Sequence, residues 1–190
     1  MSQQPKTFLT PEEYLAIERE AEYKSEYLRG ETFAMVGASR KHNLISGNVF
    51  GELRQQLKAE PCEAYINDMR VRVQSVGLYT YPDVVVVCGE PQFEDGHVDT
   101  LLNPTLLVEV LSESTESYDR GKKSAFYRTV ESLTEYLLVS QDEHRVEQYV
   151  KQGAGRWLLS DVRSLDEDVV LASLPCRLTM TSIYEKVAMP

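Results

Sequence analysis

Two short runs of almost wholly apolar residues limit the folds open to this chain. Residues 84–88 read Val-Val-Val-Val-Cys, and residues 106–111 read Leu-Leu-Val-Glu-Val-Leu. Runs of this length and composition are typical of central strands that are covered on both faces. We therefore expect the two runs to be neighbouring strands at the centre of a sheet.

Helix and hairpin signals precede these runs. A capping hydroxyl, a proline and a glutamate follow one another in Thr10-Pro11-Glu12-Glu13, which predicts a helix that extends to about Ala21. Arg29-Gly30 predicts a hairpin turn, because glycine readily adopts the positive φ of tight connections. A second helix is predicted from Ser39 to Pro61, because apolar residues recur every four positions after that cap.

Alternating residues at 69–74 predict a strand with a basic, solvent-facing side that carries Arg70 and Arg72. The other predicted elements are a helix at 119–130, strands at 136–139, 146–150 and 157–159, and a short helix at 181–187. Acidic segments at 90–99 and 161–168 are expected to be mobile surface loops. No repeat or linker interrupts this order, so we expect one α/β or α+β domain over residues 1–190.

Charge and hydropathy exclude several functions. The chain has 20 Lys and Arg against 30 Asp and Glu, a net charge of −10, which argues against broad coating of DNA. Any contact with nucleic acid must be a local patch. No apolar run approaches the ~20 residues that a membrane helix needs. Residues 1–6 are not followed by an apolar segment, so we expect no secretory signal and a cytoplasmic location.

The three cysteines, Cys62, Cys88 and Cys176, are far apart and have no CxxC spacing. This pattern disfavours a disulfide framework and a zinc site. We therefore expect buried or inert thiols.

Glu109 is the most unusual residue of the two apolar runs. An ionised side chain there would cost several kcal/mol in desolvation unless it were paired or metal-bound. On a strand, Leu107, Glu109 and Leu111 share one face, so Glu109 can point into a site while Val108 packs on the opposite side. Asp83, directly before the four valines, also needs a partner.

Two carboxylates from adjacent strands and a backbone carbonyl are the hard oxygen ligands that Mg²⁺ and Mn²⁺ prefer. Hydrolysis of a phosphodiester is a natural use of such an ion, with a lysine to stabilise the developing charge. Residues 119–128 carry four positive side chains and one negative one, and form the strongest basic patch of the chain.

Simpler interpretations stay open for each of these residues. Asp83 can cap a strand or a turn. Glu109 can form a structural ion pair with Arg70 or Arg72. The basic residues of 119–128 can form a solvated helix face.

The motifs resemble those of the Uma-type family of bacterial restriction-endonuclease-like proteins, in the PD-(D/E)XK nuclease superfamily. The resemblance rests on Pro82-Asp83, on Glu109 in Val-Glu-Val-Leu-Ser, and on Asp119-Arg120-Gly121-Lys122-Lys123 with Tyr127. It extends from Pro11-Glu12-Glu13-Tyr14-Leu15 to the terminal helix. It implies a restriction-endonuclease-like α/β core with a mixed central sheet flanked by helices.

The resemblance also implies a site and a reaction. Asp83 and Glu109 would bind Mg²⁺ or Mn²⁺, with the Val110 carbonyl as third ligand. The superfamily lysine lies two residues after the glutamate, where this chain has Leu111, so the family supplies a lysine from the next helix. The alignment selects Lys123, with Lys122 as runner-up.

Further residues have weaker assignments. Glu26 matches an acidic residue of such nucleases that can hold a second metal. The alternative interpretation is that Glu26 is a charge at the exposed edge of a hairpin. His42 and Asn48 can face a phosphate or solvent, and His97 and His144 are expected on the surface.

The resemblance implies a metal-dependent endonuclease that hydrolyses nucleic acid and works as a homodimer. DNA is the expected substrate, and no membrane partner is expected. The alternatives are a catalytically inactive domain of the same fold that binds nucleic acid or protein, and a plain oligomerisation domain.

Overall fold

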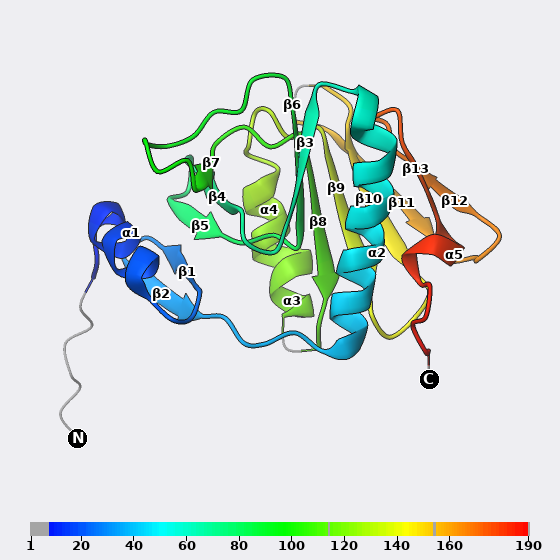
Figure 1. Cartoon of the computed structure of the whole chain (residues 1–190), viewed down its shortest axis with the longest axis horizontal. Coiled ribbons are helices and arrows are strands. Elements are labelled where there is room, and N and C mark those ends of the chain that lie inside the picture. Colours follow the sequence, from blue (N-terminus) through cyan, green and yellow to red (C-terminus); the bar gives the residue numbers. More distant parts are fainter. Residues whose placement is uncertain (1–7, 114, 154, 190) are drawn as a thin grey trace.

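The computed structural model describes residues 8–113, 115–153 and 155–189, and its centre is a six-stranded sheet (Figure 1). The two apolar runs form β6 (Val84–Cys88) and β8 (Leu106–Leu111), which are antiparallel neighbours inside this sheet. The sheet order is β11-β10-β9-β8-β6-β3. Its other strands are β3 (Cys62–Ile66), β9 (Glu135–Ser140), β10 (Val146–Lys151) and β11 (Trp157–Val162). Among the described strands of this sheet, only β8 and β9 pair in parallel, so the predicted mixed sheet with central apolar strands is confirmed.

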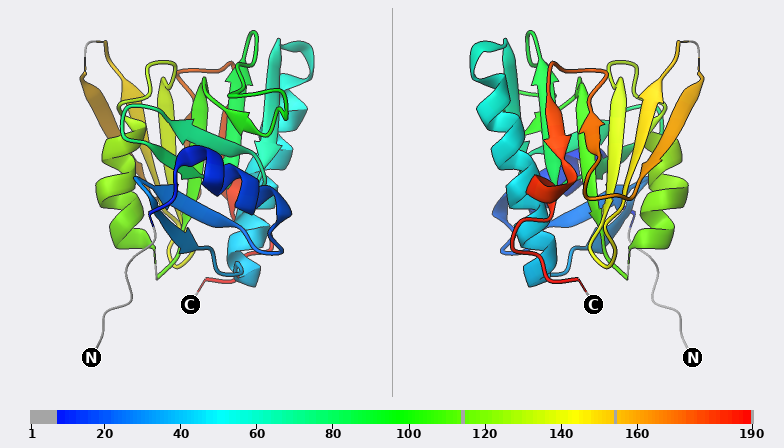
Figure 2. Two further views of the ribbon diagram at one scale, coloured as in Figure 1. Left: turned by 90° about the vertical axis from the view of Figure 1, so that its left-hand side faces the viewer. Right: turned by 90° about the vertical axis from the view of Figure 1, so that its right-hand side faces the viewer.

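A second sheet contains the predicted hairpin. Its order is β2-β1-β5-β4-β7, with β1 (Ser25–Leu28), β2 (Glu31–Ala34), β5 (Leu78–Thr80), β4 (Arg70–Val73) and β7 (Thr100–Leu101). The helix α1 (Pro11–Glu20) begins at the expected capping box, in which Thr10 and Glu13 bond each other's backbone N–H. Tyr14 of α1 packs on Tyr27 and Tyr79 of the sheet, and Figure 2 shows α1 and the hairpin on one side of the molecule.

One face of the central sheet is covered by α2 (Arg40–Gln56), which begins after the Ser39 cap as expected. Ile45, Val49 and Leu53 are fully buried there against alternate residues of β6 and β8. A 3-10 turn (Leu57–Ala59) follows α2. The strands β12 (Asp168–Val170) and β13 (Arg177–Thr179) and the helix α5 (Met180–Ile183) complete this layer, and α5 is shorter than the predicted helix.

The opposite face is covered by the second sheet and by one helical segment. This segment consists of α3 (Glu116–Tyr118), a π-helical turn (Asp119–Lys123) and α4 (Ser124–Tyr127), and we call it helix 116–127. Tyr127 is fully buried there with Leu107 and Leu111 of β8. The predicted division of β8 into two faces is therefore confirmed, because Val108 and Val110 pack on the α2 side.

The basic strand face was predicted incorrectly. Arg70 is only 4% exposed, and its guanidinium donates to the hydroxyl of Tyr81 at 2.8 Å and to Thr100 at 3.0 Å. The alternating pattern predicts that Arg70 faces solvent. It cannot show the partners that bury Arg70, because they lie outside residues 69–74. Asp99, from the loop expected to be mobile, lies 3.5 Å from Arg70 and accepts a 2.8 Å hydrogen bond from Arg19.

The expectation of unpaired thiols is also wrong for two cysteines. Cys62 and Cys88 form a disulfide between β3 and β6, where the strand register places them opposite each other. Only Cys176 is a free, buried thiol. Among the described residues, no helix combines the length and apolar character needed to cross a membrane. The prediction about a secretory signal in residues 1–6 lies outside the described residues.

Candidate functional site

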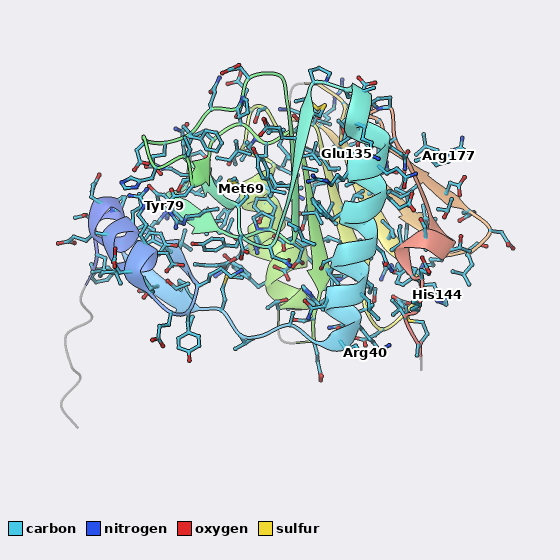
Figure 3. The ribbon with its side chains drawn as sticks, in the orientation of Figure 1. Arg40, Met69, Tyr79, Glu135, His144 and Arg177 are labelled. Atoms are coloured by element: carbon cyan, nitrogen blue, oxygen red, sulfur yellow. A yellow bond between two sulfur atoms is a disulfide. The ribbon has the colours of Figure 1, made fainter. Side chains whose placement is uncertain are left out.

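The candidate site lies where β6 begins and β8 ends, because these strands are antiparallel. Asp83 directly precedes β6, and its carboxylate accepts a 2.7 Å hydrogen bond from the Val110 backbone N–H. Within a strand, the N–H and C=O of one residue point to the same side, so the Val110 carbonyl faces the Asp83 side. His42 of α2 places its Nε2 atom 3.2 Å from the same Asp83 oxygen. Arg40, labelled in Figure 3, marks this end of α2.

Glu109 projects from β8 toward helix 116–127 and is 5% exposed. Its carboxylate accepts a 2.6 Å hydrogen bond from the Tyr127 hydroxyl and lies 2.9 Å from the Lys123 ammonium. The alternative prediction, a structural ion pair between Glu109 and an arginine, is wrong. Arg70 pairs with Asp99, and Arg72 pairs with Glu94.

Helix 116–127 presents one face to Glu109. Asp119, Lys123 and Tyr127 recur at intervals of four residues and are all buried. The Lys123 ammonium also lies 3.7 Å from the Asp119 carboxylate. Lys122 points away and is exposed, so the helix geometry brings Lys123 to the carboxylates and leaves Lys122 in solvent. The π-helical turn widens this part of the helix, and such turns are frequent at functional sites.

Glu26 reaches the same lysine from the second sheet. Its carboxylate lies 2.9 Å from the Lys123 ammonium and accepts a hydrogen bond from the Thr80 hydroxyl. The Glu26 side chain is only 14% exposed, so it is not a charge on an exposed hairpin edge. Lys123 therefore joins side chains from both sheets and from its own helix.

We call Glu26, Asp83, Glu109 and Asp119 the carboxylate cluster, in which negative groups outnumber the single lysine. Burial raises the pKa of Glu109 to about 8, and Asp119 and Asp83 add to this while Lys123 opposes it. Burial also raises the pKa of Asp119. Burial alone would lower the pKa of Lys123, but the charge of Glu109, with Tyr127, Glu26 and Asp119, raises it well above its usual range.

The donor set at Asp83, Glu109 and the Val110 carbonyl has the chemistry of a Mg²⁺ site, with hard oxygen atoms from two carboxylates and one backbone group. Mg²⁺ usually takes only one or two protein carboxylates and completes its shell with water and substrate phosphate. No group of three or more His, Cys, Asp or Glu side chains among the described residues is arranged to hold a metal ion. The expected Mg²⁺ ligands are two carboxylate side chains and one backbone carbonyl. They therefore include fewer side chains than a group of three.

The remaining polar residues of the prediction have other surroundings. Asn48 donates to the backbone carbonyls of Ile183 and Glu185 and thereby joins α2 to the C-terminal segment. His97 is exposed as expected, whereas His144 is half-buried with its ring against Tyr184. Asp119 and Tyr127 carried no predicted role in the site, although their four-residue spacing with Lys123 was a usable signal.

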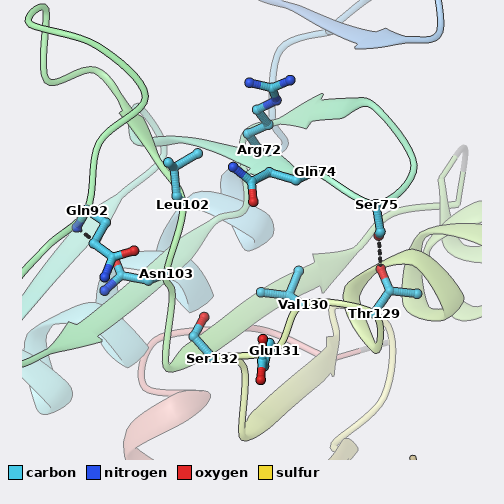
Figure 4. A pocket seen from close by; sticks show the side chains of 10 residues that line it. All are labelled: Arg72, Gln74, Ser75, Gln92, Leu102, Asn103, Thr129, Val130, Glu131 and Ser132. Carbon is cyan, nitrogen blue, oxygen red and sulfur yellow. Dashed lines mark hydrogen bonds between the residues drawn. The ribbon is translucent and has the colours of Figure 1, made fainter.

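A polar cleft of about 510 Å³ is lined by residues outside the carboxylate cluster (Figure 4). It is lined by Arg72, Gln74, Ser75, Gln92, Leu102, Asn103, Thr129, Val130, Glu131 and Ser132. It shares no lining residue with the carboxylate cluster. Its only cation, Arg72, is paired with Glu94, so the cleft lacks the concentration of charge that distinguishes the cluster.

Comparison with solved structures identifies the class of fold. A crystal structure described as "a putative nuclease belonging to DUF820", from Anabaena variabilis, superposes with a TM-score of 0.76. The two chains are 18% identical, and the match covers 95% of this chain and 99% of the other. The predicted restriction-endonuclease-like architecture, a mixed sheet flanked by helices, is thereby confirmed.

Sequence comparison identifies the family. The Uma2 family model, described as "Putative restriction endonuclease", matches residues 11–182, and the chain belongs to this family. An uncharacterized protein of Synechocystis is 38% identical over 161 residues, which are 85% of this chain and 91% of that protein. A second uncharacterized Synechocystis protein is 35% identical over 180 residues, or 95% of this chain and 93% of its own length. The family description supports a nuclease function.

Proposed function

We propose that the protein is a Mg²⁺-dependent endonuclease that hydrolyses phosphodiester bonds at the carboxylate cluster. The observation that carries this proposal is the position of Lys123. Its ammonium lies 2.9 Å from Glu109, and the register of β6 and β8 brings Asp83 to the same end of the sheet. A carboxylate pair on adjacent strands can bind Mg²⁺, and a buried lysine beside it can stabilise the negative charge that develops in phosphodiester hydrolysis.

Asp83, Glu109 and the Val110 carbonyl would hold the Mg²⁺ ion. When bound, the ion polarises a phosphoryl oxygen and lowers the pKa of water. Mn²⁺ suits the same oxygen ligands.

Side chains of the protein stabilise charge and position the reacting groups. Lys123 carries the positive charge that stabilises the extra negative charge of the transition state. Tyr127 orients Glu109 through its 2.6 Å hydrogen bond, and Glu26 holds the ammonium of Lys123 from the side of the second sheet. Because helix 116–127 and both sheets are packed against each other, these groups are positioned before substrate arrives.

The substrate we propose is DNA, in keeping with the family description, and the assembly a homodimer that brings two sites to two strands. We place the reaction in the cytoplasm, where cysteines are usually kept as thiols, so the Cys62–Cys88 disulfide is expected to form only under oxidising conditions. Alkylation of the protein in freshly lysed cells should therefore label Cys62 and Cys88, and an intact disulfide would argue against this location.

The decisive experiment measures Mn²⁺ binding by calorimetry and cleavage of DNA and RNA for the same variants. Asp83→Ala and Glu109→Ala should lose both metal binding and cleavage while keeping the circular dichroism of the native protein. Lys123→Met should cleave about 100-fold more slowly or worse.

Lys122→Met is the matched control, because Lys122 is the adjacent residue with the same side chain in solvent. It should cleave at the rate of the native protein. Nucleic-acid binding without any turnover, in the native protein and in Lys123→Met alike, would instead favour a non-catalytic binding domain.

A further inference from the structure

Phe33 is an exposed aromatic residue placed beside the candidate site. It lies on the edge strand β2, directly opposite Glu26 in the antiparallel register of β1 and β2. Directly opposite residues of such a pair project from the same face of the sheet, with Cβ atoms about 5 Å apart. The Phe33 ring is therefore on the face from which Glu26 contacts Lys123, and it is 49% exposed.

A second aromatic residue precedes the turn that carries Lys123. Tyr118, in α3, is partly exposed and lies directly before the π-helical turn. Burial raises its pKa to about 12, and the negative charge of Glu26 adds to this. Because Lys123 of that turn contacts Glu26, the hairpin and helix 116–127 each carry an aromatic residue on an element that forms the site.

Comparison with another edge strand shows what is particular about Phe33. Leu158 on β11 is 54% exposed, which resembles the exposure of Phe33. Its directly opposite partner is Val150, however, and no residue of the carboxylate cluster lies on β10 or β11. Single exposed apolar residues are common on protein surfaces, so the neighbouring site, not the exposure, gives Phe33 its significance.

We propose that Phe33 is a stacking surface for an unpaired nucleobase of the strand held in the site. The inference rests on the nuclease function proposed above and specifies its substrate further. Every base has a π-face that can stack on an aromatic ring, but inside a duplex both faces are covered by neighbouring bases. A ring beside the scissile position therefore favours single-stranded DNA over an intact duplex. In the two-stranded substrate of the proposed homodimer, the base beside each cut would leave the helix to stack on Phe33.

The test is steady-state cleavage in Mn²⁺ of a single-stranded DNA oligonucleotide, a duplex of the same sequence, and a single strand made of abasic nucleotides. Phe33→Ala should raise the KM for the single strand about 10-fold or more and change kcat by less than about twofold. On the abasic strand, which has no base to stack, Phe33→Ala and the native protein should have the same KM. Phe33→Trp should restore the native KM, and Leu158→Ala should match the native protein on all three substrates.

An unchanged KM in Phe33→Ala, or an equal loss on the normal and abasic strands, would overturn the stacking role and leave the nuclease function intact. A loss of dimer in Phe33→Ala by gel filtration, with an unchanged KM, would overturn it too and assign the residue to an interface between copies. If the native protein cleaves none of these substrates and no RNA, the nuclease proposal fails, and the stacking role fails with it.

Discussion

The protein has two ionic networks that differ in their balance of charge. Beside the second sheet, Arg19 of α1 and the buried Arg70 of β4 form ion pairs with Asp95 and Asp99, which belong to a partly exposed loop. These ion pairs involve two cations and two anions. Hydrogen bonds from Arg19, more than any other contact, hold the pKa of Asp99 at about 2. In the carboxylate cluster, Glu26, Glu109 and Asp119 share Lys123, and Asp83 contacts His42. The pKa values of Glu109 and Asp119 are raised there instead.

The difference separates a structural network from a chemical one. Balanced ion pairs neutralise each other's charge and need no further partner. An excess of buried negative charge keeps a demand for protons or cations, and such strongly perturbed groups concentrate at functional sites. Substitutions that break one network or the other should therefore have different effects on stability, the largest at Arg70.

Arg70→Met should have the largest effect on stability. Arg70 is 4% exposed and is held by Tyr81, Thr100 and Asp99, so its removal leaves buried polar groups without their donor. We expect the free energy of unfolding to fall by about 3 kcal/mol in urea denaturation. Arg177→Met, which breaks an exposed pair with Asp168, should cost less than about 1 kcal/mol. Equal losses in the two variants would contradict the structural role of the network around Arg70.

Asp99→Asn should change the dependence of stability on acid pH. The folded-state pKa of Asp99, about 2, lies below its ordinary value near 4, so its stabilisation is complete above about pH 4 and is lost as the pH falls toward 2. The variant should be about 1–2 kcal/mol less stable than the native protein at pH 6. The two curves should converge near pH 2, measured by denaturation at each pH. Parallel curves over that range would show that Asp99 does not titrate with folding.

Glu109→Gln should change the dependence of stability on pH above the ordinary glutamate pKa of 4.5, and in the opposite direction. The pKa of Glu109 is raised in the folded state, so the folded protein holds a proton that the unfolded chain releases, and stability falls as the pH rises from about 4.5 through neutral pH. Each pH unit in that window should cost the native protein at most about 1.4 kcal/mol through this group. Glutamine imitates the protonated carboxyl, so the variant should lack that loss while it loses cleavage. A native slope in the variant would assign the titration to another group.

Local signals made much of the fold predictable. The capping box at Thr10 and the cap at Ser39 each depend on residues within one turn, and both helices begin there. The apolar runs of β6 and β8 identify central strands because their burial leaves few alternatives. Short strands such as β5 and β7 carry too few residues to show a period, so their pairing is decided by the sheet around them.

The burial of Arg70 and the disulfide could not be predicted, because both depend on partners outside the local sequence. Arg70 becomes buried because Tyr81 and Asp99 reach it across the fold, and the strand alternation around it carries no trace of them. The Cys62–Cys88 disulfide depends on the register of β3 against β6.

The candidate site was partly visible in the sequence. Glu109 interrupts an apolar run, and Asp83 directly precedes one, so the neighbours of each residue alone mark it as unusual. The contact between Lys123 and Glu26 joins two sheets, and nothing in the local sequence of either residue indicates it. The resemblance to the family supplied both residues, and helix geometry distinguishes buried Lys123 from exposed Lys122.

The packing of the hairpin gives the site an uneven resistance to local unfolding. Glu26 stands on β1, which is joined to α1 by a small cluster of Tyr14, Leu15, Tyr27 and Tyr79, whereas Asp83 and Glu109 belong to the larger core of the central sheet. Segments with the fewest buried contacts open most readily, on a free-energy scale below that of global unfolding. Each such opening of α1 and the hairpin withdraws Glu26 from Lys123 and leaves Asp83 and Glu109 in place. Amide hydrogens of β1 should therefore exchange faster than those of β8, and the fraction of molecules with all four carboxylates assembled is set by the least protected part of the chain.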